Sequence, residues 1–162
     1  MTWYLDSSAI LKLLIAEKES AALTDFINFT IKSSALTRVE VIRTLHKIAP
    51  ERVADAKVIL GGIDVTPVNT SVLSTAENFN PSITLRSLDA IHVATVLFLA
   101  KTVEGLITYD KQMITNAKKL GIKDNSLFIR IYNIAQHTYS NTKPIWVLHL
   151  TTIYLSSTRT PY

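Results

Sequence analysis

The sequence contains no cysteine, which excludes a disulfide framework and a thiolate metal site. Long apolar segments are also missing. The most apolar stretch of helix length, residues 90–100, is far shorter than the roughly 20 residues that a membrane span needs. No basic segment precedes the first apolar run, which Asp6 interrupts. We therefore expect no signal peptide, no membrane contact and a cytoplasmic location.

Acidic residues are missing from the last part of the chain. Residues 125–162 hold three basic side chains and no carboxylate, whereas residues 1–124 hold 14 basic and 13 acidic groups. The net charge of +4 therefore comes mainly from the tail, and it is weak support for nucleic-acid binding by the rest. We expect one domain over 1–124, followed by an extension over 125–162 with one candidate strand at 127–132 and a poorly ordered end.

The remaining composition is that of a folded domain. Hydrophobic residues make up 48% of the chain and charged residues 19%, and the mean hydropathy is +0.22. These values exclude wholesale disorder, and the chain is long enough to bury a core. The apolar excess also suggests that a partner covers part of the surface.

Short apolar runs alternate with helical patterns along residues 1–124. We expect strands at 3–5, 33–36, 63–68 and 105–108, and helices at 9–14, 21–29, 37–49, 50–60, 70–79, 84–101 and 112–120. Gly121 follows the last helix as a C-terminal cap. Strands that alternate with helices predict an α/β fold with a parallel sheet and helices on both faces.

Four acidic residues fall where such a fold would bring them together. Asp6 ends the first expected strand and Asp110 follows the last one, so both lie at the shared carboxyl edge of the sheet. Glu40, in the first turn of its expected helix, and Asp89, on an otherwise apolar helix face, can reach the same edge. Clustered carboxylates raise each other's pKa, and Mg²⁺ or Mn²⁺ relieves that repulsion. Such a site implies phosphodiester hydrolysis.

Each acid also has a purely structural explanation. Glu40 follows Thr37 by three residues, the spacing of a capping box. Asp6 and Asp110 could each cap the helix that follows. An acid on an apolar face needs a partner, and for Asp89 that partner could be an arginine at position 38 or 43. Spacing alone leaves both explanations open.

Four segments, in this order and at these intervals, carry a resemblance to a known family. They are YLDSSA at 4–9, ALTRVEV at 35–41, LDAIHVA at 88–94 and LITYD at 106–110, and AKKLGI at 117–122 follows them. The sequence resembles the PIN-domain ribonucleases, and within them the VapC-type toxins of prokaryotic toxin–antitoxin pairs. The resemblance covers about residues 1–123.

The resemblance implies a three-layer α/β/α sandwich with a short central parallel sheet and a Mg²⁺- or Mn²⁺-dependent endoribonuclease. The family's catalytic acids correspond to Asp6, Glu40, Asp89 and Asp110. Of these, the three aspartates would hold the metal, and Glu40 would ligate it or orient the attacking water. The small polar residues that support such a site correspond to Ser8 and Thr108.

Several other residues near these acids have less certain roles. Arg86 could hold a phosphate, although a solvated helix position is the simpler interpretation. Arg38 could pair with Glu40 or touch RNA. His92 stands where the family often has a histidine, and we interpret it as a core residue. Trp3 and Tyr4 are likewise interpreted as strand core rather than as platforms for base stacking.

The resemblance also implies partners. They are an RNA substrate, with tRNA a usual target in the family, a cognate antitoxin bound in an apolar groove beside the site, and a second copy in a homodimer. The alternative is a non-catalytic PIN-like module for RNA binding or scaffolding, in which the acids only cap helices. Another Mg²⁺-dependent phosphoryl-transfer domain is less well supported, because the first strand ends in Asp-Ser-Ser rather than Asp-x-Asp.

Overall fold

The first strand separates two hydrophobic cores because its side chains alternate in direction. In β1 (Thr2–Leu5), Trp3 and Leu5 face one core and Tyr4 faces the other. The structure is a computed structural model that describes residues 1–15, 20, 23, 27 and 30–122. The helix expected at 21–29, the strand expected at 127–132 and the extension over 125–162 lie outside the described residues.

A parallel four-stranded sheet forms the centre of the fold. It has the order β3-β2-β1-β4, where β2 is Thr30–Ser34, β3 is Asp64–Thr66 and β4 is Leu106–Ile107. In the register of β1, Tyr4 lies opposite Lys32 of β2 and Leu106 of β4. All four strands run the same way, so their carboxyl ends share one edge, as predicted.

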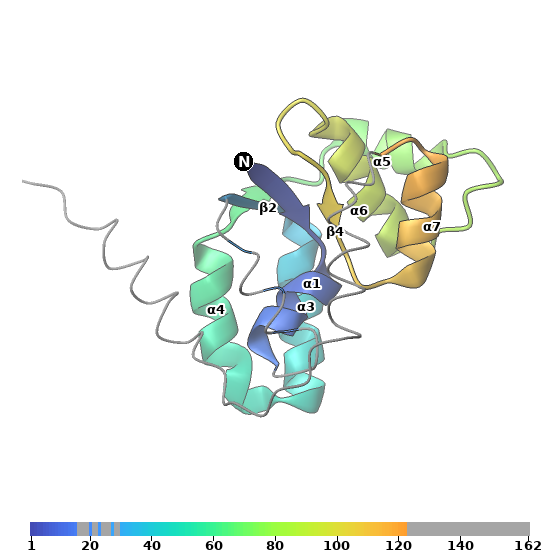
Figure 1. Ribbon diagram of the computed structural model, residues 1–162. Coiled ribbons are helices and arrows are strands. Elements are labelled where there is room, and N and C mark those ends of the chain that lie inside the picture. Colours follow the sequence, from blue (N-terminus) through green and yellow to red (C-terminus); the bar gives the residue numbers. More distant parts are fainter. Residues whose placement is uncertain (16–19, 21–22, 24–26, 28–29, 123–162) are drawn as a thin grey trace, which may run out of the picture.

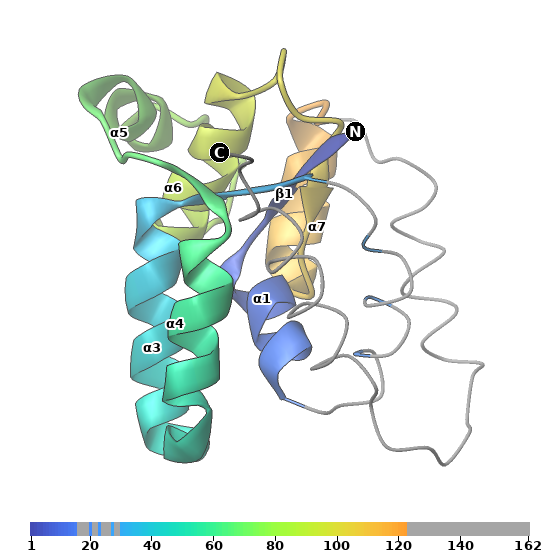
Figure 2. The same ribbon diagram turned by 90° about the vertical axis from the view of Figure 1, so that its left-hand side faces the viewer.

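Helices cover both faces of the sheet (Figures 1 and 2). On one face lie α1 (Ser7–Leu14), α3 (Ala35–Ile48) and α4 (Val53–Gly61), with a short 3-10 turn at Pro50–Arg52 between the last two. On the other lie α6 (Ser87–Phe98) and α7 (Lys111–Lys119), and α5 (Thr70–Glu77) packs against α6. This is the expected three-layer sandwich. Among the described residues, no helix is long and apolar enough to cross a membrane.

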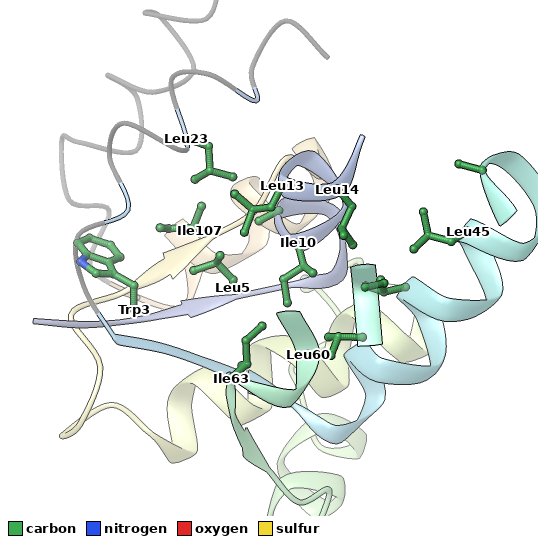
Figure 3. Close-up of a cluster of buried hydrophobic side chains, with 14 residues drawn as sticks. Trp3, Leu5, Ile10, Leu13, Leu14, Leu23, Leu45, Leu60, Ile63 and Ile107 are labelled. Atoms are coloured by element: carbon green, nitrogen blue, oxygen red, sulfur yellow. The ribbon is translucent and has the colours of Figure 1, made fainter. Parts of the chain in front are cut away.

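The larger core lies between the sheet and α1, α3 and α4. Figure 3 shows Leu5 and Ile107 of the strands against Ile10 and Leu14 of α1, with Leu45 of α3 beside them. Each fully buried side chain of this kind stabilises the fold by about 1.5–3 kcal/mol relative to an exposed one. This core fixes where the strands end, and therefore where the acids that follow them lie.

The helix that carries Glu40 begins earlier than predicted. It starts at Ala35 rather than after Thr37, and the Ser34 hydroxyl caps it by accepting a bond from the Leu36 amide at 3.2 Å. Thr37 is buried, and its hydroxyl is 2.7 Å from that of Ser33. The expected first-turn position and the capping-box explanation for Glu40 are therefore wrong, because Glu40 lies in the second turn.

The end of α7 follows the prediction. Gly121 adopts a positive φ of 68°, which few other residues tolerate. Its amide donates to the Lys118 carbonyl at 3.0 Å, and the Ile122 amide donates to the Ala117 carbonyl at 3.1 Å. These two hydrogen bonds end the helix.

Candidate active site

The carboxyl edge of the sheet gathers the four predicted acids. Asp6 directly follows β1, and Asp110 follows β4 by three residues. Asp6 and Asp110 are the N-caps of α1 and α7, and Asp89 lies in the first turn of α6. Helix N-termini carry partial positive charge, so all three aspartates lie where a negative charge is favoured. Glu40 comes from α3, which follows β2 directly.

Asp6 is the most buried of the four, with 3% of its surface exposed. Its carboxylate accepts hydrogen bonds from the Ser8 hydroxyl at 2.8 Å, the Thr108 hydroxyl at 2.7 Å and the Ala9 amide at 2.9 Å. Burial nevertheless raises the pKa of Asp6, because the neighbouring His92 and these donors offset only part of the lost hydration. Asp6 therefore caps a helix, and a nearby cation would stabilise its ionised form.

Ser8 and Thr108 connect the ends of β1 and β4. The Thr108 hydroxyl also accepts a bond from the Asp110 amide at 3.0 Å, and the Ser8 hydroxyl accepts one from the Tyr109 amide at 2.8 Å. Asp110 in turn caps α7 by accepting from the Met113 amide at 2.8 Å. The two strand ends are thus joined by hydroxyl bridges that hold Asp6 and Asp110 in one network.

An arginine joins Asp89 to Asp110. Arg86 donates from Nε to Asp89 at 2.8 Å and from its terminal nitrogen to Asp110 at 3.1 Å. The predicted partner of Asp89, Arg38 or Arg43, is therefore wrong: the partner is Arg86, which lies one helical turn before Asp89. Although 70% of its side chain is exposed, it is not simply solvated as expected, and its bonds to Asp89 raise its pKa. Arg38 is exposed on α3 and makes no ion pair with the four acids.

Glu40 is held by hydrogen bonds from a serine and a histidine instead of an arginine. Its Oε2 accepts a hydrogen bond from the Ser7 hydroxyl and lies 2.7 Å from Nε2 of His92. Burial alone would raise the pKa of Glu40, but the bonds from His92 and Ser7 outweigh it and lower the pKa. Glu40 is therefore ionised at neutral pH.

His92 is buried, as a core residue should be, but it has polar partners that the sequence did not reveal. Nδ1 lies 2.7 Å from the Tyr4 hydroxyl, while Nε2 reaches Glu40. Tyr4 is buried in the strand as expected. Only the spacing in the sequence could have indicated a role at the site, because a residue three positions after Asp89 lies on the same face of α6.

The donor set has the chemistry of a site for a hard divalent cation. Its ligating groups are carboxylate oxygens, and buried Asp6 has only neutral donors around it. Within the described residues, no three carboxylates or imidazoles are yet placed to share one ion. Two of the four acids, Asp89 and Asp110, are instead engaged by Arg86. A cation here would have to take over bonds that the guanidinium now makes.

Known proteins match this chain in sequence and in fold. The sequence model of the PIN domain family matches residues 3–119 of this chain. The ribonuclease VapC46 of Mycobacterium tuberculosis is 40% identical over 121 residues, which cover 74% of this chain and 92% of that protein. The ribonuclease VapC47 of the same species is 33% identical over 125 residues, or 73% of this chain and 91% of the relative.

A solved structure with the same fold is that of VapC20 from Mycobacterium tuberculosis, a toxin that cleaves the sarcin–ricin loop. It superposes with a TM-score of 0.61 at 14% identity and covers 76% of this chain and 98% of that one.

Proposed function

The chain belongs to the PIN-domain family, as a member of the VapC type, and we propose that it is a metal-dependent endoribonuclease. The observation that carries this proposal is the convergence of Asp6, Glu40, Asp89 and Asp110 on one edge of the sheet. The ribonuclease activity of the relatives supports it. We also propose that the chain meets this RNA in the cytoplasm.

Asp6, Asp89 and Asp110 are the residues that would hold Mg²⁺ or Mn²⁺. When bound, such an ion polarises the scissile phosphate and lowers the pKa of a water. Ser8 and Thr108 would keep the Asp6 carboxylate in place through the bonds they already make. The charge of Asp6, which burial disfavours in the metal-free protein, is a reason for the protein to bind a cation there.

Glu40 is suited to orient and deprotonate the attacking water. Both of its observed donors contact Oε2, and among the described residues none donates to Oε1. That oxygen can therefore accept a hydrogen bond from water. The low pKa of the carboxylate keeps it able to accept a proton at neutral pH.

Arg86 is suited to contact the RNA. The guanidinium is largely exposed and is already at the edge of the site. Released from Asp89 and Asp110, it could bind a phosphate oxygen of the substrate in a two-pronged manner.

Cleavage of a structured RNA such as tRNA by the purified full chain tests the proposal. We expect cleavage with Mn²⁺ or Mg²⁺, none with EDTA, and a loss of at least about a hundredfold in Asp89→Asn. The matched control is Asp55→Asn, which removes the same charge from the Arg52–Asp55 pair at the start of α4. Equal cleavage by both variants would contradict the assignment. Absence of any Mn²⁺ site in a calorimetric titration would favour the non-catalytic module instead.

We also propose a cognate antitoxin as the natural inhibitor. A solved structure with the same fold is a toxin–antitoxin complex from Klebsiella pneumoniae, which supports such a partner. A second copy of the chain in a homodimer is a further expectation, which sedimentation of the purified protein tests.

A further inference from the structure

A buried polar chain runs from the strand β1 to Glu40. It consists of Tyr4, His92 and Glu40, and both links, Tyr4 hydroxyl to Nδ1 and Nε2 to Oε2, are 2.7 Å long. The rings of Tyr4 and His92 meet edge to face, with their centroids 6.0 Å apart and an angle of 72° between their planes. His92 is only 2% exposed, so water does not compete for either ring nitrogen.

The partners determine which nitrogen of His92 carries the proton. Glu40 is ionised and can only accept, so Nε2 must carry a hydrogen to make its bond. A phenol carries its proton at neutral pH, so the Tyr4 hydroxyl can donate to Nδ1. A neutral imidazole has one donor and one acceptor, and these two partners use one each.

We propose that His92 is a positioning residue for Glu40, set in its Nε2–H tautomer by the Tyr4 hydroxyl. This inference deepens the proposed function, because it explains how one oxygen of the general base is held while the other stays available. The bond from His92 fixes the direction of the carboxylate. The bond from Tyr4 prevents the ring from presenting a bare nitrogen to Glu40, which would repel it.

A histidine that merely filled space would not need this arrangement. His92 follows Ile91 and precedes Val93 on α6, where an apolar side chain would pack without any cost of burying polar atoms. Burying an imidazole is favourable only when both nitrogens have partners, as they do here. One of those partners, Glu40, is half-buried at the candidate site, so the network ends at the proposed reaction centre.

The first test measures the tautomer in the metal-free protein, without RNA. The nitrogen chemical shifts of His92 should show a protonated Nε2 and an unprotonated Nδ1. In Tyr4→Phe, which keeps the ring but loses the donor, we expect a mixture of tautomers. A proton on Nδ1 in the wild-type protein would overturn the proposal. This measurement stands apart from the proposed function, since it needs no cleavage.

The second test compares variants in cleavage. His92→Met fills the space but cannot donate, whereas His92→Gln keeps an N–H that can reach Glu40. We expect kcat to fall about tenfold to a hundredfold in His92→Met, with KM changed less than about twofold. His92→Gln should recover a large part of the loss. His46→Gln, on the exposed side of α3, is the matched control and should cleave like the wild type.

The decisive comparison repeats His92→Met in a Glu40→Gln background. If His92 acts through Glu40, the second substitution should add less than about a threefold further loss. A full additional loss there would mean that His92 only supports the fold, and would overturn the proposal. Should His92→Met fail to fold, Tyr4→Phe takes its place in the same cycle with a smaller expected loss. If the wild-type protein cleaves no RNA, the proposed function fails, and the tautomer measurement alone judges His92.

Discussion

The two halves of the candidate site hold their negative charge by different means. On the Glu40 side, formed by Glu40, Ser7, His92 and Tyr4, a hydroxyl and a buried imidazole hold one carboxylate. On the Arg86 side, formed by Asp89, Arg86 and Asp110, an exposed cation bridges two carboxylates. The buried donors are fixed by the packing around them, whereas an exposed guanidinium can be displaced. In the proposed function, the first side would therefore transfer a proton and the second would bind the cation.

The largest expected effect comes from breaking the Arg86 side at Asp110. Asp110→Asn should lower cleavage by about a thousandfold and weaken Mn²⁺ binding, because one metal ligand loses its charge. Asparagine still caps a helix, so α7 should remain folded by circular dichroism. Calorimetric Mn²⁺ titration alongside cleavage checks both results, and unchanged Mn²⁺ affinity would remove Asp110 from the metal set.

Breaking the Glu40 side should separate catalysis from metal binding. Glu40→Gln should lower kcat by about a hundredfold, because the proton acceptor is lost. Its Mn²⁺ affinity should change little, since Glu40 is held by Ser7 and His92 rather than by the cation. A large fall in Mn²⁺ affinity in this variant would instead make Glu40 a ligand and erase the contrast between the two sides.

Removing the guanidinium of Arg86, which bridges the two aspartates, should have a smaller effect and should raise the affinity for metal. Arg86→Gln frees Asp89 and Asp110, so Mn²⁺ should bind about threefold to tenfold more tightly at low salt. The KM for RNA should rise, because the proposed phosphate contact is lost. The gain in Mn²⁺ affinity should shrink at high salt, which screens exposed pairs. Weaker Mn²⁺ binding would show that Arg86 does not compete with the ion.

The pH dependence of stability tests the buried member of the set. Folding raises the pKa of Asp6, so its stability contribution is complete below the ordinary carboxyl range and is lost as pH rises through the raised value. With chelator at neutral pH, Asp6→Asn should therefore increase the free energy of unfolding by about 1–2 kcal/mol. The gain should vanish on acidification. Urea unfolding at several pH values measures it, and a variant less stable at every pH would refute this.

The smallest expected effect comes from an exposed ion pair that belongs to neither side. Asp55→Asn breaks the Arg52–Asp55 bond of 2.9 Å on the surface. We expect it to change the free energy of unfolding by less than about 0.5 kcal/mol and to leave cleavage unchanged. A larger change would show that exposed pairs matter more here than assumed, and would weaken the reasoning about Arg86.

Much of the fold could be predicted from local patterns. The alternation of strands and helices, the parallel sheet and the cap at Gly121 follow from apolar spacing and from backbone preferences that act within a few residues. The start of α3 could not be found that way. Thr37 has a hydroxyl that could cap a helix, but this hydroxyl contacts that of buried Ser33 instead. Ser33 is held there by the packing of β2 against β1, where its hydroxyl donates to the Leu5 carbonyl.

By itself, the sequence determined that Asp6, Asp89 and Asp110 reach the carboxyl edge, because each lies next to a strand end or a helix start and the strands are parallel. Only the tertiary structure decided what each acid meets there. Arg86 bridges two aspartates that lie 21 positions apart, and His92 links a strand residue to a glutamate on another helix. Such contacts depend on how helices pack over the sheet, and their strength depends on burial. Neither the packing of the helices nor the burial of these side chains can be read from the spacing of residues along the chain.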